Sequence, residues 1–151
     1  MTAYALPIRY GLATSGSLIA YFLVLSLFGL HTNVFYSLAN GIFMGFGIFE
    51  AIKAFRLSEG KDYNFGKGFA AGAVTGVTAT FVFTLFFAFY STEINLEFLP
   101  NLATVFFDDL RGFEGIVFLT VAIMGIATTV VLTLAFMQLF KSSGQQGKKT
   151  D

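Results

Sequence analysis

The sequence contains no cysteine, a single histidine, two prolines and few charged residues. Without cysteine, the chain can form no disulfide, no thiolate metal site and no cysteine nucleophile. Charged residues make up only 12% of the chain, well below the usual share in soluble domains, while 56% of residues are hydrophobic and 18% aromatic. With a mean hydropathy of +0.75, this composition indicates a membrane protein.

Four apolar runs predict transmembrane helices, because each is long enough to cross the hydrocarbon core of a bilayer. The runs cover residues 10–30, 34–55, 66–90 and 113–140. Pro7 and Pro100 lie outside them, so no span is expected to contain a proline kink. We expect an all-α integral membrane protein with one four-helix transmembrane domain over residues 1–140. A polar, glycine-rich cytoplasmic tail, 141–151, should follow without regular structure.

Lysine and arginine are distributed unevenly between the two sides of this predicted bundle, and that distribution sets orientation. Arg111 alone falls on one side. The other side receives all remaining basic residues: Arg9, Lys53, Arg56, Lys61, Lys67, Lys141, Lys148 and Lys149. Both termini are therefore expected in the cytoplasm.

The segment between the third and fourth runs has an amphipathic pattern. Leu99, Leu102, Phe106, Leu110 and Phe113 recur at helical spacing, and polar residues occupy the opposite face. This pattern predicts a short amphipathic helix lying in the outer membrane–water interface.

Small residues recur at every fourth position of the third run, at Gly68, Gly72, Gly76, Thr80 and Thr84. Lipid provides no hydrophobic drive for helix association, so small residues act by letting helix backbones approach closely. These residues are predicted to form a helix-packing face, whose partner helix belongs either to the same chain or to another.

Shorter lines of small residues occur in the three other runs. The first run contains Gly11 and Ser15. The second run contains Gly41 and Gly45, and the fourth run contains Gly125 followed by threonines. We assign these glycines to helix packing on the same grounds.

Two glycine-rich stretches come close to nucleotide-binding motifs without meeting their requirements. Residues 66–71 fit the pattern G-x-G-x-x-[GA], but no β-strand precedes them. In residues 60–67 the two glycines of a P-loop are separated by five residues, where four are needed. We therefore expect no nucleotide cofactor and no nucleic-acid partner.

Few residues in the predicted spans could carry chemistry. His31 lies in a short turn without a second metal ligand near it, and no nucleophile–base set can be proposed, so we expect no enzyme. The polar candidates are Asn40, Glu50 and Lys53. Glu50 and Lys53 are three positions apart, which suits either an interfacial ion pair or an ion or proton site.

Three segments resemble a known family. RYGL at 9–12, AIKAFR at 51–56 and NFGKGFAAG at 64–72 are similar to the domain of unknown function 4199 family, small four-helix membrane proteins of Gram-negative bacteria. The resemblance extends up to Phe140 and is weakest in the outer loop, 92–112. It implies an integral inner-membrane protein and transfers no catalytic residues.

These observations favour a non-enzymatic accessory or assembly subunit. Its expected partners are the lipid bilayer and other integral membrane proteins, in a larger complex or a homo-oligomer. The alternative is a small transporter or channel subunit, in which Asn40, Glu50 and the threonines of the third run line a path.

Overall fold

The computed structural model describes residues 4–30, 33–94, 97 and 113–146, and these residues form helices without any β-strand. The four long helices are α1 (Ala5–Leu27), α2 (Val34–Glu59), α3 (Phe65–Phe89) and α5 (Phe113–Gln146). Each is long and apolar enough to cross a membrane. The prediction of four helices that can span a membrane is thus confirmed within the described residues. The expectation that both prolines lie outside the spans was wrong, because α1 begins before the predicted residue 10 and contains Pro7 in its first turn, where proline is tolerated.

Asparagine side chains begin two of these helices. The Asn33 side chain accepts a hydrogen bond from the Phe35 backbone N–H at 3.0 Å, and the Asn64 side chain accepts one from the Lys67 N–H at 2.9 Å. Such caps satisfy amide groups that the first turn of a helix leaves unpaired. Gly60, with a φ of 55°, ends α2 and leads into the short 3-10 helix η1 (Gly60–Asp62). These signals keep the α2–α3 connection short.

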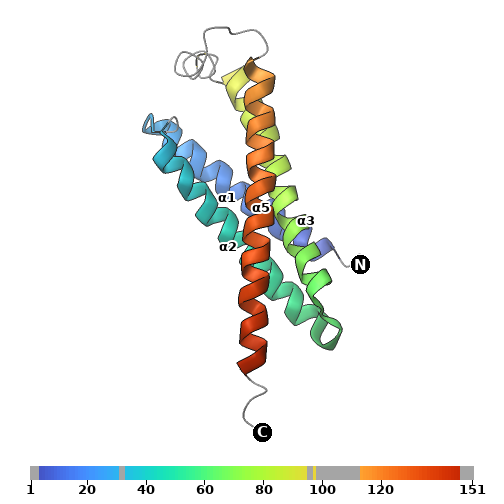
Figure 1. Cartoon of the computed structure of the whole chain (residues 1–151). Helices are drawn as coiled ribbons and strands as arrows, with labels where there is room; N and C mark the ends of the chain where they lie inside the picture. The colour runs from blue at the N-terminus through green and yellow to red at the C-terminus, as the bar shows by residue number, and fades with distance from the viewer. Residues whose placement is uncertain (1–3, 31–32, 95–96, 98–112, 147–151) are drawn as a thin grey trace.

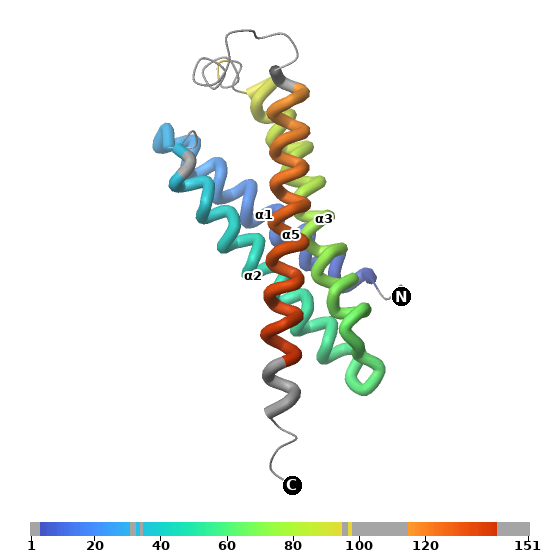
Figure 2. Tube along the Cα trace, in the orientation of Figure 1, coloured from blue at the N-terminus to red at the C-terminus, as the bar shows by residue number. Residues whose placement is uncertain are grey.

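The four helices form two crossing antiparallel pairs (Figure 1). The α1–α2 hairpin is inclined to the pair made by α3 and α5, as the tube in Figure 2 also shows. Helices α2 and α3 each contact the three other long helices, and α3 makes the more extensive contacts with α1 and α5.

Two hydrophobic clusters fill the bundle at different levels. The lower cluster brings together all four helices through Leu18, Met44, Ile48, Ile52, Ala79 and Met137. The upper cluster is aromatic and centres on Phe22 of α1. The Phe22 ring lies nearly perpendicular to the rings of Tyr90 at 5.0 Å, Phe87 at 5.8 Å and Phe86 at 6.1 Å between centroids. Edge-to-face geometry of this kind adds attraction beyond burial alone.

Helix α3 ends in a π-helical turn, η2 (Tyr90–Ile94), which the sequence did not predict. The Thr92 hydroxyl donates to the Ala88 carbonyl at 2.8 Å, and the Ser91 hydroxyl donates to the Phe87 carbonyl. The Tyr90 and Ser26 hydroxyls share a hydrogen bond that ties this turn to the end of α1. Wide turns are rare and have no clear sequence signal, which explains the omission.

Two further expectations concern the segments beside α5. The predicted amphipathic helix falls almost wholly on residues 98–112, which lie outside the described residues, so it stays a prediction. The fourth span was predicted to end at 140, but the helix α5 continues to Gln146. The first residues of the predicted tail are therefore helical, because a helix already formed in the membrane propagates into water at little cost.

The aromatic cluster generates a prediction. Phe22→Leu should lower the free energy of unfolding by about 1 kcal/mol, because it removes edge-to-face contacts and leaves a void. The measurement is the midpoint of detergent-induced unfolding followed by circular dichroism. Phe46→Leu is the matched control, since Phe46 is 69% exposed on α2. Equal losses in both variants would contradict the assigned role of the cluster.

Candidate functional site

The glycine stripe of α3 lies against α5, with a threonine opposite each glycine at two successive levels. A Cβ atom added at Gly72 would lie 2.6 Å from the Thr133 methyl carbon, and one added at Gly76 would lie under 3.0 Å from Thr129. The roles reverse at the next level, where a Cβ at Gly125 of α5 would meet Thr80 of α3 within the same limit. The two backbones can approach this closely only because one residue of each pair is glycine.

The same arrangement joins the other helices. Gly11 of α1 lies against Thr78 of α3, where an added Cβ would be 2.7 Å from the threonine Cβ. Gly47 of α2 lies against Thr14 of α1, and a Cβ added at Gly47 would be closer to the threonine side chain than real Cβ contacts are. Glycine–threonine contacts therefore occur in the α1–α2, α1–α3 and α3–α5 interfaces. We call these five contacts the glycine–threonine pairs.

The remaining predicted packing glycines differ from one another. Gly68 lies against Tyr63 and Met137, and a Cβ there would be 2.8 Å from the methionine methyl carbon. Gly45 is in ordinary van der Waals contact, 3.7 Å from Leu132 and Phe136 side-chain atoms. Gly41 has nothing within 4 Å. The structure thus brings Gly45 to α5 loosely and leaves Gly41 on an open face of the chain.

Sequence reasoning missed Gly47, because it is not four residues from Gly41 or Gly45. The buried positions of α2 contain the signal that could have found it. Met44, Ile48 and Ala51 are all buried, and Gly47 falls on the face that they define. Burial periodicity is therefore a better guide here than glycine spacing.

Threonine hydroxyls in and beside these pairs differ in their hydrogen bonding. Thr14, Thr75 and Thr129 donate to backbone carbonyls four residues earlier, at 2.7, 2.9 and 2.8 Å. The hydroxyls of Thr80, Thr84 and Thr133 are buried and have no hydrogen-bond partner among the described residues.

Two of these unpartnered hydroxyls lie beside glycine backbone. The Thr80 oxygen is 2.7 Å from the position of an added Cβ at Gly125, and the Thr133 oxygen is 2.9 Å from that position at Gly72. A Cβ would replace one glycine Hα, so each oxygen, like the threonine methyl carbon beside it, lies close to that hydrogen. Weak Cα–H···O contacts of this kind recur at helix–helix interfaces.

The polar residues predicted within α2 do not form one site. Glu50 and Lys53 form an ion pair of 3.6 Å, with side chains 31% and 52% exposed. Asn40 lies ten positions before Glu50 along α2, about 15 Å at the rise of a helix. Its side-chain oxygen is buried without a hydrogen-bond partner in the described part of the chain.

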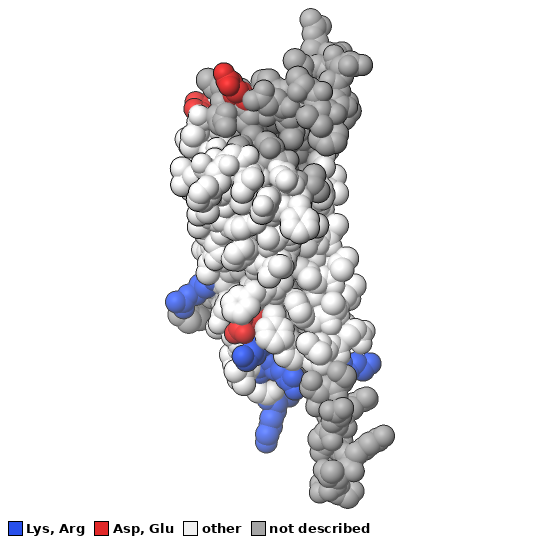
Figure 3. Space-filling view, turned by 90° about the vertical axis from the view of Figure 1, so that its left-hand side faces the viewer, with Lys and Arg blue, Asp and Glu red and all other residues white. Residues whose placement is uncertain are grey.

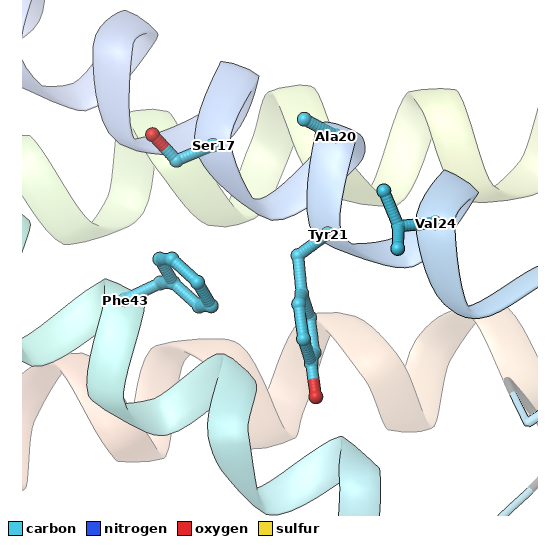
Figure 4. Close-up of a pocket in the computed structure, with 5 residues that line it drawn as sticks. All are labelled: Ser17, Ala20, Tyr21, Val24 and Phe43. Carbon is cyan, nitrogen blue, oxygen red and sulfur yellow. The ribbon is translucent and has the colours of Figure 1, made fainter.

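A shallow groove of about 330 Å³ opens on the outer side of α1 and α2 (Figure 4). Its lining is Ser17, Ala20, Tyr21, Val24 and Phe43. The Tyr21 hydroxyl already donates to the Tyr36 carbonyl at 2.9 Å, and the Ser17 hydroxyl donates to the Ala13 carbonyl at 3.2 Å. The groove lacks the convergent polar groups of a substrate site. Over residues 4–30, 33–94 and 113–146, no group of three or more His, Asp or Glu side chains could hold a metal ion.

Four long apolar helices joined by small-residue contacts place this chain in the class of multi-pass membrane proteins. The model of the family "Protein of unknown function (DUF4199)" matches residues 9–115, and the chain belongs to this family. The match covers α1, α2 and α3 and ends near the start of α5, so the expected resemblance beyond residue 115 is not part of it. No curated protein and no solved structure matches the chain.

The α3–α5 contact generates a prediction. Gly76→Ala should lower the free energy of unfolding by about 1–3 kcal/mol, because the added methyl overlaps Thr129 and must push the two helices apart. Gly16→Ala is the control, since nothing lies within 4 Å of Gly16. That substitution should be neutral or slightly stabilising, as alanine is the better helix former. Unfolding midpoints in mild detergent measure both effects.

A double-mutant cycle tests whether Gly76→Ala destabilises the protein through overlap with Thr129 or through another effect of replacing glycine in α3. Thr129→Ala removes the methyl and hydroxyl groups, the two atoms nearest to the new methyl, and leaves only the Cβ at 2.8 Å. The double variant should therefore recover about 1 kcal/mol relative to the sum of the single effects. Strict additivity would show that Gly76 and Thr129 do not constrain each other.

Proposed function

We propose that this protein is a non-enzymatic accessory or assembly subunit of a bacterial inner membrane, with both termini in the cytoplasm. It packs against other integral membrane proteins. The inner membrane is proposed from the resemblance of the sequence to a family of Gram-negative bacteria. The proposal needs a surface that is not already used to hold the chain together.

The observation that carries the proposal is the exposure of α5. Only 6% of its most apolar window is buried, against 33% in each of the other three spans. Ile116, Leu119, Ile123, Met124 and Val131 are all more than half exposed on its outer face. The inner face of α5 attaches it to the rest of the bundle, through the buried residues Thr129, Thr133 and Met137 and through partly buried residues such as Phe118 and Phe136. Most of the surface of α5 therefore remains available to another membrane protein.

Charge placement supports the proposed orientation. The basic side chains that Figure 3 shows in blue gather toward one end of the molecule, where η1 joins α2 to α3. Glu93 lies at the opposite end, in η2. Basic residues accumulate on the cytoplasmic side of membrane proteins, so the η1 end is assigned to the cytoplasm.

The test is native mass spectrometry of the protein extracted from its own membrane in mild detergent, without overexpression. We expect a stoichiometric assembly with at least one other membrane protein. Val131→Trp places bulk on the outer face of α5, where the side chain is 65% exposed, and should release the partner. Leu12→Trp is the control on α1, at a side chain 51% exposed, and should leave the assembly intact. A protein that emerges alone, or an assembly that survives Val131→Trp, would contradict the proposal.

A small transporter or channel subunit is the second candidate, and the buried, unpartnered oxygen of Asn40 favours it. Polar groups without partners inside a membrane bundle often mark a path for solutes or ions. In this case purified protein in vesicles should pass ions, and both Asn40→Leu and Glu50→Gln should abolish the flux. Lys61→Gln in η1 is the control, because Lys61 is exposed outside the long helices. Vesicles without flux, or equal flux in all variants, would remove this candidate.

A further inference from the structure

Arg56 is held between two aromatic rings at the end of the bundle assigned to the cytoplasm. Its guanidinium carbon lies 5.8 Å from the centre of the Tyr63 ring and 5.7 Å from the centre of the Phe140 ring. Three segments meet here, because Arg56 is in the last turn of α2, Tyr63 follows η1 and Phe140 is near the end of α5. Contacts with two rings orient the guanidinium plane and attract its charge.

Arg56 has no carboxylate partner among the described residues. The two glutamates of α2 are occupied, since Glu50 pairs with Lys53 at 3.6 Å and Glu59 pairs with Lys67 at 2.6 Å. Asp62 lies near Lys67, whose charge it faces. The guanidinium N–H groups of Arg56 are therefore available to bind an anion, and the side chain is already partly buried.

Tyr63 does not supply a negative charge either. Burial raises the pKa of its hydroxyl above the ordinary value, and the nearby Arg56 opposes this shift without cancelling it. The neutral hydroxyl donates to the Met137 sulfur at 3.5 Å. Tyr63 thus acts on Arg56 through its ring.

An apolar wall extends from Arg56 toward the middle of the membrane. The Phe49 ring of α2 stacks on Phe140 of α5 at 5.3 Å between centroids and meets Phe136 at 5.4 Å. Phe46, about one turn before Phe49 in α2 and therefore further from Arg56, is 69% exposed. In the sequence, the apolar run of α5 ends at Phe140 and polar residues follow from Lys141, which places the neighbouring guanidinium at the expected boundary between hydrocarbon and headgroups.

We propose that Arg56 binds the phosphate of an anionic phospholipid whose acyl chain lies along Phe49, Phe136 and the exposed Phe46. The arrangement provides both parts of such a ligand: an oriented, unpaired fork of donors at headgroup depth, and an aromatic wall below it. Lys141 adds positive charge next to Phe140, and it has no ion-pair partner within the described residues. This extra charge favours an anionic headgroup over a zwitterionic one.

The test is a titration of the detergent-solubilised full chain with phosphatidylglycerol, read by native mass spectrometry as the one-to-one complex. Arg56→Gln should weaken binding by about tenfold or more, because it removes a charge-assisted bidentate contact. Arg56→Lys keeps the charge but loses the fork, and should weaken binding by about threefold. Lys61→Gln removes an exposed cation of the same end and should stay within about twofold of the wild type.

Two further titrations distinguish an anionic phospholipid from a zwitterionic one and from free phosphate. Phosphatidylcholine with the same acyl chains should bind at least about fivefold more weakly than phosphatidylglycerol. Inorganic phosphate in millimolar excess should not displace the lipid, because it makes no contact with the aromatic wall.

Several results would overturn the proposal: wild-type affinity in Arg56→Gln, equal losses in Arg56→Gln and Lys61→Gln, equal binding of the two lipids, or displacement by inorganic phosphate. Circular dichroism verifies the fold of each variant. If Arg56→Gln does not fold, Arg56→Lys and Phe140→Leu decide instead. Phe140→Leu removes one supporting ring and should weaken binding by about threefold.

Discussion

The helices of this protein are held together by threonine side chains that rest on glycine backbone. Inside a bilayer the lipid tails are as apolar as leucine, so burial of large aliphatic residues does little to drive helices together. Dispersion contacts are made only at short range, and close approach requires one helix to lack side-chain atoms where the other has them. Gly11, Gly47, Gly72, Gly76 and Gly125 provide those gaps, and each is filled by a threonine of a neighbouring helix.

Other features of the structure follow from where these contacts stop. Four of the five glycine–threonine pairs lie in the middle of α3, and bulky aromatic residues replace them toward its end at Phe83, Phe86 and Phe87. At the opposite end Gly68 admits the Tyr63 side chain, which in turn orients Arg56. The ion pairs Glu50–Lys53 and Glu59–Lys67 lie near that same end of α2, where water and headgroups can solvate them. Along its length the bundle therefore has an aromatic level, a small-residue level and a charged level.

Much of this architecture could be predicted from the sequence because it depends on length and composition. The four spans follow from apolar runs, and the α3 stripe at Gly68, Gly72 and Gly76 was identified from its spacing. The structure adds the identity of the partners, since Gly72 and Gly76 meet threonines of α5 and Gly68 meets Tyr63 and Met137, all in the same chain. Spacing along one helix carries no information about which residue lies opposite, so pairs such as Gly47 with Thr14 could not be derived.

The candidate polar site was harder to judge for a related reason. Glu50 and Lys53 are near neighbours on one helix, so their ion pair could be expected from local geometry alone. The cation–π contacts of Arg56 depend on Phe140, which lies more than eighty residues later and on a different helix. No local pattern signals such a contact. The π-turn after α3 likewise depends on the tertiary hydrogen bond between Tyr90 and Ser26.

Glycine and threonine exchange helices along the α3–α5 interface, and this affects how α5 can slide along α3. Glycine lies on α3 at the levels of Thr133 and Thr129, but on α5 at the level of Thr80. A slide of one helical turn in one direction would oppose Thr80 with Thr129, so that two branched side chains compete for one space. A slide in the other direction would oppose Gly76 with Gly125 and leave a void. The pattern therefore fixes the register of α5 against α3. The two helices can separate, but a slide by one turn is unfavourable in both directions.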